Sequence, residues 1–374
     1  PIPLDSGTTR ILELSEPEQT FTFDGVVARP VASLLRGFSA PVRLTADQSE
    51  SDLLTLMSGD DDDFVAWDAA QSLLARAIEA LDLTGQEAKI HNALLEAIER
   101  VLTGPMDAAM KALTLCLPSE EYLADRAAQR GLVDMTDIHL RRQAVKRLLG
   151  QALDSQWRAV SSQSVVGSPY IASAHEIGVR SLRHLALDYL LAAQSASLTQ
   201  AEQLLESADN LTDRLAALRW IAQYANGAQR EQTLANFYDR WKRESLVVNQ
   251  WFTVQATRPD NSCVESVRGL LNHDAFDWRN PNKLRALVGA FSAANPLAFH
   301  RVDGAGYQLL GDVITRIQSS NPQIAARMLA PLTRWRRYAV GQDAMKAELE
   351  RIAGIDPLPK DVFEVVNRSL AEPD

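Results

Sequence analysis

The chain has 374 residues, of which 46% are hydrophobic and 23% are charged, and its formal net charge is −10. This composition is typical of a folded, water-soluble protein, and the length suits an extended repeat array better than one ordinary domain. The acidic balance argues against a general nucleic-acid binder.

The N-terminus and the apolar segments give no sign of export or of a membrane span. The first residues lack the basic stretch and apolar core of a signal peptide. The longest apolar stretch, near residues 185–193, contains Asp188 and is far shorter than a membrane span. Cys116 and Cys263 are predicted to be buried free thiols rather than a disulfide or a metal site. We therefore expect a cytoplasmic protein with no membrane partner.

The first 45 residues have the pattern of short β-strands. Residues 19–23 alternate polar and apolar side chains, Asp24-Gly25 is a tight-turn signal, and an extended run resumes at residues 26–27. Two further short strands are predicted at residues 11–14 and 41–44. Four strands of this size are marginal alone. We therefore interpret residues 1–45 as the end of a β-sandwich whose other strands precede Pro1, in a piece of a longer chain.

From about Asp47 the apolar residues recur with a helical period, and residues 46–374 are predicted to form one helical domain. Short polar connections predict that neighbouring helices pack antiparallel. The expected fold is mainly α: an irregular, HEAT-like α-α superhelix of helical hairpins, whose curvature creates a concave face. The later helices are expected near residues 199–207, 211–225, 228–243, 245–256, 262–271, 281–293, 305–319, 322–339, 342–353 and 359–370.

Local signals predict where several of these helices begin and break. Asn280-Pro281, Asn295-Pro296 and Asn321-Pro322 each place an Asn cap before a Pro at the first helical position. Pro331 is expected to kink its helix near Arg327. From Asn261 onward basic and acidic residues almost balance, so this last third is where we expect an anionic ligand group to bind.

The residues that could carry chemistry form no complete catalytic centre. His175-Glu176 begins a zinc-peptidase pattern, but Val179 stands where its second His is needed. The acidic run at residues 60–63 is expected to be a solvated helix cap rather than a calcium loop. The Gly-rich residues 303–307 predict a turn before a helix, and His300 a structural or channel-wall side chain. No catalytic residue, metal ligand or cofactor is assigned to this chain.

Several ordered blocks resemble bacterial aminopeptidase N, the zinc-dependent alanyl aminopeptidase. They include residues 18–24 (EQTFTFD), 67–74 (WDAAQSLL), 266–271 (SVRGLL), 280–285 (NPNKLR), 295–300 (NPLAFH) and 303–307 (DGAGY). The resemblance is strong at both ends of the chain and weak between about residues 83 and 205. It covers the C-terminal part of that enzyme, namely the end of a small β-sandwich and the helical domain.

The resemblance implies that this chain caps a catalytic domain that lies upstream in the same polypeptide. The H-E-x-x-H helix and the other zinc ligands of the family lie in that upstream part, so zinc belongs to the full-length enzyme and this fragment is expected to be inactive alone. The cap would limit entry to peptide substrates. Two arginines that reach toward the chamber in the family fall here on Arg285 and Arg327.

Two alternatives stay open at this point. The two arginines either bind the carbonyls or the carboxylate of a peptide, or only form exposed or interdomain ion pairs. The chain itself is either the aminopeptidase cap or a free-standing helical-repeat scaffold that binds a protein partner through exposed apolar patches.

Overall fold

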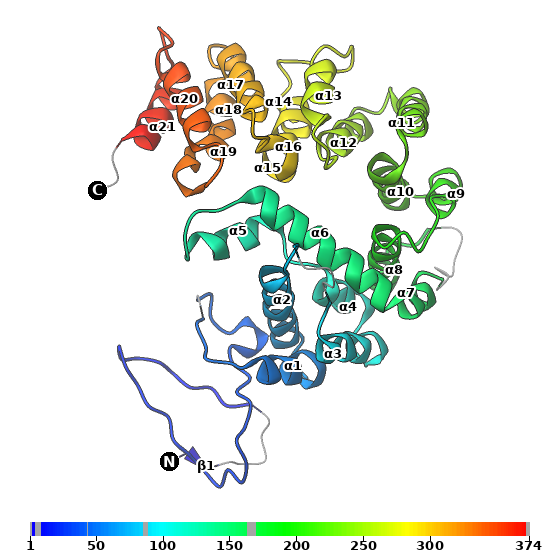
Figure 1. Ribbon diagram of the computed structural model, residues 1–374, viewed down its shortest axis with the longest axis vertical. Helices are drawn as coiled ribbons and strands as arrows, with labels where there is room; N and C mark the ends of the chain where they lie inside the picture. Colours follow the sequence, from blue (N-terminus) through cyan, green and yellow to red (C-terminus); the bar gives the residue numbers. More distant parts are fainter. Residues whose placement is uncertain (1, 4–8, 43, 85–88, 163–169, 372–374) are drawn as a thin grey trace.

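The computed structural model describes residues 2–3, 9–42, 44–84, 89–162 and 170–371. Almost all its regular structure is helical, and the later helices follow one another along an open arc (Figure 1). The α5 and α6 helices lie inside this arc and face its last third (Figure 1). The prediction of a mainly helical, curved repeat fold is confirmed.

The first helices form a packed group that supports α6. The α2 helix packs on α1, α4 and α6, while α8 packs on α4, α6 and α7. The bounds in this part are α1 (Glu50–Gly59), α2 (Asp63–Ala80), α3 (Asn92–Thr103), α4 (Ala108–Leu115), α5 (Glu120–Ala128), α6 (Met135–Ala152), α7 (Asp154–Ser161) and α8 (Ala174–Ala192).

The rest of the chain forms the arc, in which successive helices pack on their neighbours. Its first part comprises α9 (Thr199–Ser207), α10 (Leu211–Tyr224), α11 (Gly227–Trp241), α12 (Ser245–Ala256) and α13 (Cys263–Leu270). Its last part comprises α14 (Pro281–Leu284), the π-helical η2 (Arg285–Gly289), α15 (Ala290–Ala294), α16 (Pro296–Phe299), α17 (Ala305–Ile317), α18 (Pro322–Met328), α19 (Ala330–Thr333), η3 (Trp335–Arg337), α20 (Gln342–Ala353) and α21 (Lys360–Leu370).

The predicted helix starts are confirmed. The side chains of Asn280, Asn295 and Asn321 each accept a hydrogen bond from a backbone N–H of the first helical turn, and a Pro follows each of them. The break expected from Pro331 is also present, because α18 ends at Met328 and α19 begins at Ala330. These starts fix where α14, α16 and α18 begin along the arc.

The described residues of the N-terminal segment contain less β-structure than predicted. Its strands are β1 (Ile2–Pro3) and β2 (Phe23–Asp24), which pair in parallel with Ile2 opposite Phe23. The strands predicted at residues 11–14 and 26–27 are wrong, and the described residues of 41–44 (Arg43 lies outside them) are not a strand either. A strand needs a partner backbone to bond, and these residues find none in the described part of the chain.

A continuous apolar core runs through the helical part of the chain. In the first group of helices, the ring of Trp157 on α7 stacks on that of Tyr189 on α8, with 4.6 Å between the ring centroids. The indole N–H donates to the Leu149 carbonyl at 3.1 Å, and the Tyr189 hydroxyl donates to the Leu115 carbonyl at 2.8 Å. Both buried polar groups are therefore satisfied, and α4, α6, α7 and α8 are held in one unit.

Candidate functional site: a basic cleft inside the arc

A cleft of about 710 Å³ lies where α5 and α6 face the last part of the arc. Its inner wall is formed by residues between 119 and 146 on α5, α6 and their flanks, and its outer wall by residues between 257 and 338, with Gln223 of α10 also lining it. Ligand pockets in proteins measure about 300–1,000 Å³, so this cleft is large enough for a short peptide.

Arg285 and Arg327 lie on the outer wall, on different helices of the arc, and both line this cleft. Arg285 is the first residue of the π-helical segment η2, and such segments occur often at functional sites. Its guanidinium donates to the Asn282 side chain at 3.2 Å. Arg327 lies in the last turn of α18 and has no hydrogen bond or ion pair among the described residues. The structure thus brings the two predicted site residues to one cleft.

The other cations of the cleft differ in how they are compensated. Three of them pair with a carboxylate: Lys146 with Asp188 at 2.6 Å, Arg334 with Glu121 at 2.8 Å, and Arg337 with Asp125 at 2.9 Å.

Arg142 on α6 has no such partner. Its Nε donates to the Pro118 carbonyl at 2.7 Å and its Nη2 to the Leu117 carbonyl at 3.3 Å. In the described part of the chain, Arg142, Arg285 and Arg327 therefore line the cleft without a carboxylate partner. Three uncompensated guanidiniums favour an anionic group in this space.

The two walls of the cleft touch at the α5–α6 connection. The Val133 N–H donates to the Arg337 carbonyl at 2.7 Å, and the Ala339 N–H donates to the Val133 carbonyl at 2.8 Å. With the ion pairs of Arg334 and Arg337, these bonds hold α5 against residues more than 200 positions away in sequence. The α6 helix also packs on α16, so the cleft is built from distant segments.

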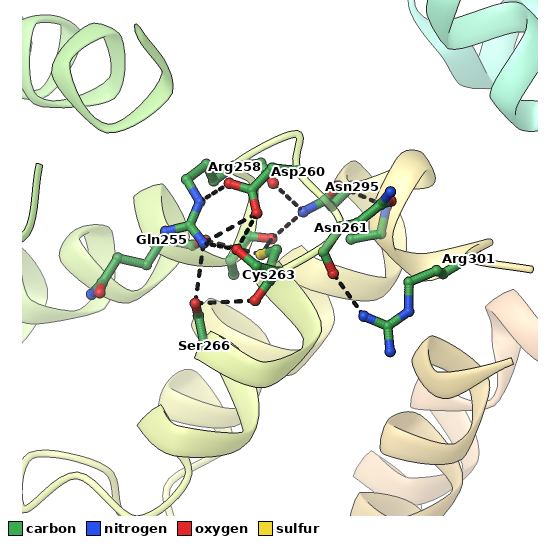
Figure 2. Close-up of polar contacts among 11 residues, drawn as sticks. Gln255, Arg258, Asp260, Asn261, Cys263, Ser266, Asn295 and Arg301 are labelled. Carbon is green, nitrogen blue, oxygen red and sulfur yellow. Dashed lines mark hydrogen bonds and ion pairs between the residues drawn. The ribbon is translucent and has the colours of Figure 1, made fainter. Parts of the chain in front are cut away.

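A network of hydrogen bonds braces the outer wall where the α12–α13 connection meets α16 (Figure 2). The amide of Asn295 donates to the carbonyls of Ala256 and Arg258 at 2.9 and 2.7 Å. The Arg258 guanidinium binds the Asp260 carboxylate, and Arg301 donates to the Asn261 carbonyl at 2.8 Å. Thr257, Pro259 and Asn295 line the cleft, so this network fixes their backbone.

Two histidines lie on the cleft walls. His139, on the inner wall, is within 2.7 Å of the Glu120 carboxylate through its Nδ1. His300, on the outer wall, is buried, and its Nδ1 lies 2.9 Å from the Tyr307 hydroxyl. Burial and the nearby positive charge of Arg337 lower the pKa of His300 to about 3, so its imidazole is neutral at ordinary pH. The expectation that His300 is a structural or wall residue agrees with this position.

The chain matches two family models along most of its length. Residues 50–371 match the family described as "Domain of unknown function (DUF3458_C) ARM repeats", and residues 3–47 match "Domain of unknown function (DUF3458) Ig-like fold". The chain is 37% identical over 380 residues to aminopeptidase N of Escherichia coli strain K12. It belongs to the aminopeptidase N family. The resemblance seen in the sequence is thereby confirmed, and the chain corresponds to the C-terminal region of aminopeptidase N.

Further relatives agree on this region of aminopeptidase N. The match in E. coli covers 99% of this chain and 43% of the relative, and aminopeptidase N of Haemophilus influenzae is 36% identical over 96% of this chain and 41% of its own length. A crystal structure of Legionella pneumophila aminopeptidase A in complex with aspartic acid has a TM-score of 0.82 and 28% identity, covering 92% of this chain and 41% of that one. This chain therefore spans less than half the length of these relatives.

The acidic run at residues 60–63 and the Gly-rich turn at residues 303–307 take the predicted local roles, whereas Cys116 does not. The acidic run does cap α2 through Asp62, but it is not simply solvated, because Asp60 binds Arg36 at 2.8 Å. Residues 302–304 form the predicted turn, which ends at the N-cap Gly304, and α17 begins at Ala305. The prediction that Cys116 is buried is wrong: Cys116 is exposed because it lies at the end of α4 rather than inside a helix.

Cys263 is buried as expected. Its thiol donates to the Gln255 and Ala256 carbonyls at 3.2 and 3.3 Å, and burial raises the pKa of Cys263 to about 12. His175 is exposed, and the described residues hold no group of three or more His, Cys, Asp or Glu that could bind a metal ion. The residues described here thus do not fit a zinc site. No described helix is long and apolar enough to cross a membrane.

Sequence reasoning missed the inner wall of the cleft. Arg142 and Lys146 are four residues apart on α6, so they share one helical face. That spacing is visible in the sequence. What is not visible is that this face turns toward the last part of the arc.

Proposed function

We propose that this chain caps the active-site chamber of a zinc-dependent aminopeptidase and admits peptide substrates through the basic cleft. The catalytic domain and its zinc would lie upstream in the same polypeptide, which is consistent with a chain that spans less than half of its relatives' length. In this proposal Arg285 and Arg327 bind the part of the peptide that lies away from the scissile bond.

One observation carries the proposal: two guanidiniums from separate helices line one cleft, and neither has a carboxylate partner in the described residues. A peptide supplies the missing partners, because its backbone carbonyls and terminal carboxylate accept hydrogen bonds from guanidinium groups. A charge-assisted bond of this kind contributes roughly 1.5–3 kcal/mol when water is excluded.

The alternative of a free-standing scaffold has less support from this cleft. A scaffold that binds protein partners through its concave face would expose apolar side chains there. The large apolar residues that line the cleft include Phe299, Ile324 and Met328, and these are buried. The exposed charged residues that line it are Arg285, Arg327 and Arg334 together with Glu121, and the exposed apolar ones are the small Ala293, Ala294 and Ala330. These charged groups suit a polar, charged ligand.

The test uses the full-length enzyme and two substrates, a tripeptide and an alanine arylamide. Arg327→Ala should lower kcat/KM for the tripeptide by about 10- to 100-fold, and by much less for the arylamide, which has no distal carboxylate. Arg368→Ala is the matched control, because Arg368 is an exposed arginine outside the cleft. Equal losses on both substrates would remove the peptide-binding role of Arg327.

A second test concerns the chain alone. The purified 374-residue chain should unfold cooperatively but should not hydrolyse an alanine arylamide, with or without added zinc. Zinc-dependent turnover by this sample would contradict the assignment of catalysis to an upstream domain.

A further inference from the structure

His300 lies on the outer wall of the cleft in a setting that determines which of its nitrogens carries the proton. Its Nδ1 is 2.9 Å from the hydroxyl of Tyr307, a side chain that is completely buried. The Tyr307 hydroxyl must donate its proton to an acceptor. The one acceptor that the described residues offer it is Nδ1 of His300.

A neutral imidazole has one donor and one acceptor nitrogen. Because Nδ1 accepts from Tyr307, the proton of His300 resides on Nε2. Nε2 has no partner among the described residues, yet it is not one of the buried polar atoms that lack a partner. It is therefore accessible, and the space that His300 lines is the cleft.

The surrounding backbone is built to hold this pair. A Cβ on Gly306 would lie 2.3 Å from the Phe299 carbonyl oxygen, so only glycine lets α17 approach the end of α16. A Cβ on Gly341 would lie 2.3 Å from the Tyr307 hydroxyl, and Gly341 has a φ of +82°. The absence of a side chain at Gly306 and Gly341 thus allows Tyr307 to lie within hydrogen-bond distance of His300.

The charged groups around His300 keep it neutral rather than switch it. Burial and the positive charge of Arg337 lower the pKa of His300. The Arg337 side chain itself pairs with Asp125 at 2.9 Å. The ring of Tyr338 packs against the imidazole with 4.5 Å between centroids. No carboxylate among the described residues contacts His300 to stabilise a protonated form.

We propose that His300 is a substrate-positioning residue whose Nε2–H donates a hydrogen bond to a backbone carbonyl of a peptide in the cleft, with Tyr307 fixing the tautomer. This inference rests on the proposed function, because it requires that the cleft admits peptides. A neutral donor of this kind suits a carbonyl in the middle of a peptide, whereas the arginines suit its carboxylate end.

The tautomer is tested without any substrate. In the 374-residue chain labelled with ¹⁵N-histidine, long-range ¹H–¹⁵N correlations should show His300 as the Nε2–H form, with no titration between pH 5 and 8. Loss of its signals in His300→Gln assigns them. Tyr307→Phe should shift the ring toward a mixture of tautomers. An Nδ1–H tautomer, or titration near pH 6.5, would overturn the inference.

The positioning role is tested in the full-length enzyme. His300→Leu should lower kcat/KM for a tripeptide by about 3- to 10-fold more than for an alanine arylamide, the size of one neutral hydrogen bond. His300→Gln, whose amide N–H lies near the position of Nε2, should recover most of this loss. His175→Leu is the control, because His175 is exposed and lies outside the cleft.

The outcomes separate this inference from the proposed function. If Arg327→Ala discriminates between the substrates and His300→Leu does not, the cleft binds peptides but His300 does not position them. If neither variant discriminates, both proposals fall. Should His300→Leu fail to fold, Tyr307→Phe in the same two assays decides the question, since its loss must then follow the change of tautomer.

Discussion

The helical part of this chain buries its large apolar side chains, whereas the N-terminal segment leaves most of its own exposed. Among the described residues, the buried apolar side chains begin at Leu53 and continue to Val366. Before Leu53 the large apolar side chains are exposed or half-buried; Ile11 is 88% exposed and Val27 is fully exposed. Burial of apolar area is the main stabilising term in folding, so it holds the helical part together but contributes little to the N-terminal segment.

The N-terminal segment is attached through a few specific contacts instead. Arg36 binds Asp60 and Asp61 at the start of α2, and the Gly37 N–H donates to Asp62 at 2.7 Å. The ring of Phe38 packs on Phe64, with 5.1 Å between centroids. The comparison teaches that the helical part should be sensitive to changes at buried positions, whereas the segment should respond mainly to changes at its anchors.

The largest expected effect concerns a buried charge in the helical part. The carboxylate of Asp213 is within 3.4 Å of Arg180, 3.0 Å of Arg183 and 2.6 Å of His184, and it accepts from Asn210 at 2.9 Å. Asp213→Asn would leave Arg180 and Arg183 without a counter-charge, so it should lower the free energy of unfolding by about 3–5 kcal/mol. Chemical denaturation measures this.

The same carboxylate predicts a pH dependence. Burial alone would raise the pKa of Asp213, but hydrogen bonds from His184 and Asn210 and the charges of His184 and Arg183 lower it below its usual value of 3.8. Its stabilising contribution is thus present above about pH 4 and is lost as the pH falls. Stability of Asp213→Asn should fall less steeply with acid. Asp24→Asn, at an exposed residue of the N-terminal segment, should change neither quantity.

A pair of leucines tests the comparison directly. Leu349 on α20 is completely buried, and Leu14 is 71% exposed. Leu349→Ala should cost about 2–5 kcal/mol because it removes buried methyl groups and leaves a cavity. Leu14→Ala should stay within about 0.5 kcal/mol. Similar costs at the two positions would show that the N-terminal segment has an apolar core of its own.

A pair of glycines tests how closely the helices approach. A Cβ on Gly306 would lie 2.3 Å from the Phe299 carbonyl oxygen, whereas a Cβ on Gly269 would meet nothing within 4 Å. Gly306→Ala should therefore cost about 1–3 kcal/mol, since backbone must move. Gly269→Ala should stabilise α13 by about 0.5–1 kcal/mol. Thermal unfolding of both variants provides the measurement, and a stabilising Gly306→Ala would contradict the close packing of α16 and α17.

The helices could be predicted from the sequence because their signals are local. An Asn cap followed by Pro acts within one turn, as at Asn295, and Pro331 breaks its helix at once. The strands could not be placed in this way. Residues 11–14 are mostly apolar, as in a short strand, but a strand forms only where another backbone pairs with it, and the pattern contains no information on that partner.

The residues of the candidate site also differ in whether a local sequence signal could reveal them. Arg285 and Arg327 were found through the family resemblance, which is carried by local motifs around them. Arg142 was not found, because its place opposite them depends on α6 turning toward the last part of the arc. That arrangement is set by contacts such as Val133 with Arg337, which join residues far apart in the chain. Such contacts leave no signal in a single sequence.

The smallest expected effect concerns the anchor between the two regions. Arg36→Ala removes the hydrogen bond to Asp60, whose side chain is only 4% exposed, and the one to Asp61, so it should cost about 1 kcal/mol. Its clearer readout is limited proteolysis, which should cut residues 30–48 faster while the helical part stays intact. Arg29→Ala is the matched control, because Arg29 is 75% exposed in its pair with Asp52 and such pairs contribute little. If both variants are cut at the same rate as the parent, the N-terminal segment is held by apolar contacts rather than by the Arg36 anchor. The proposed difference between the two regions would then be wrong at their junction.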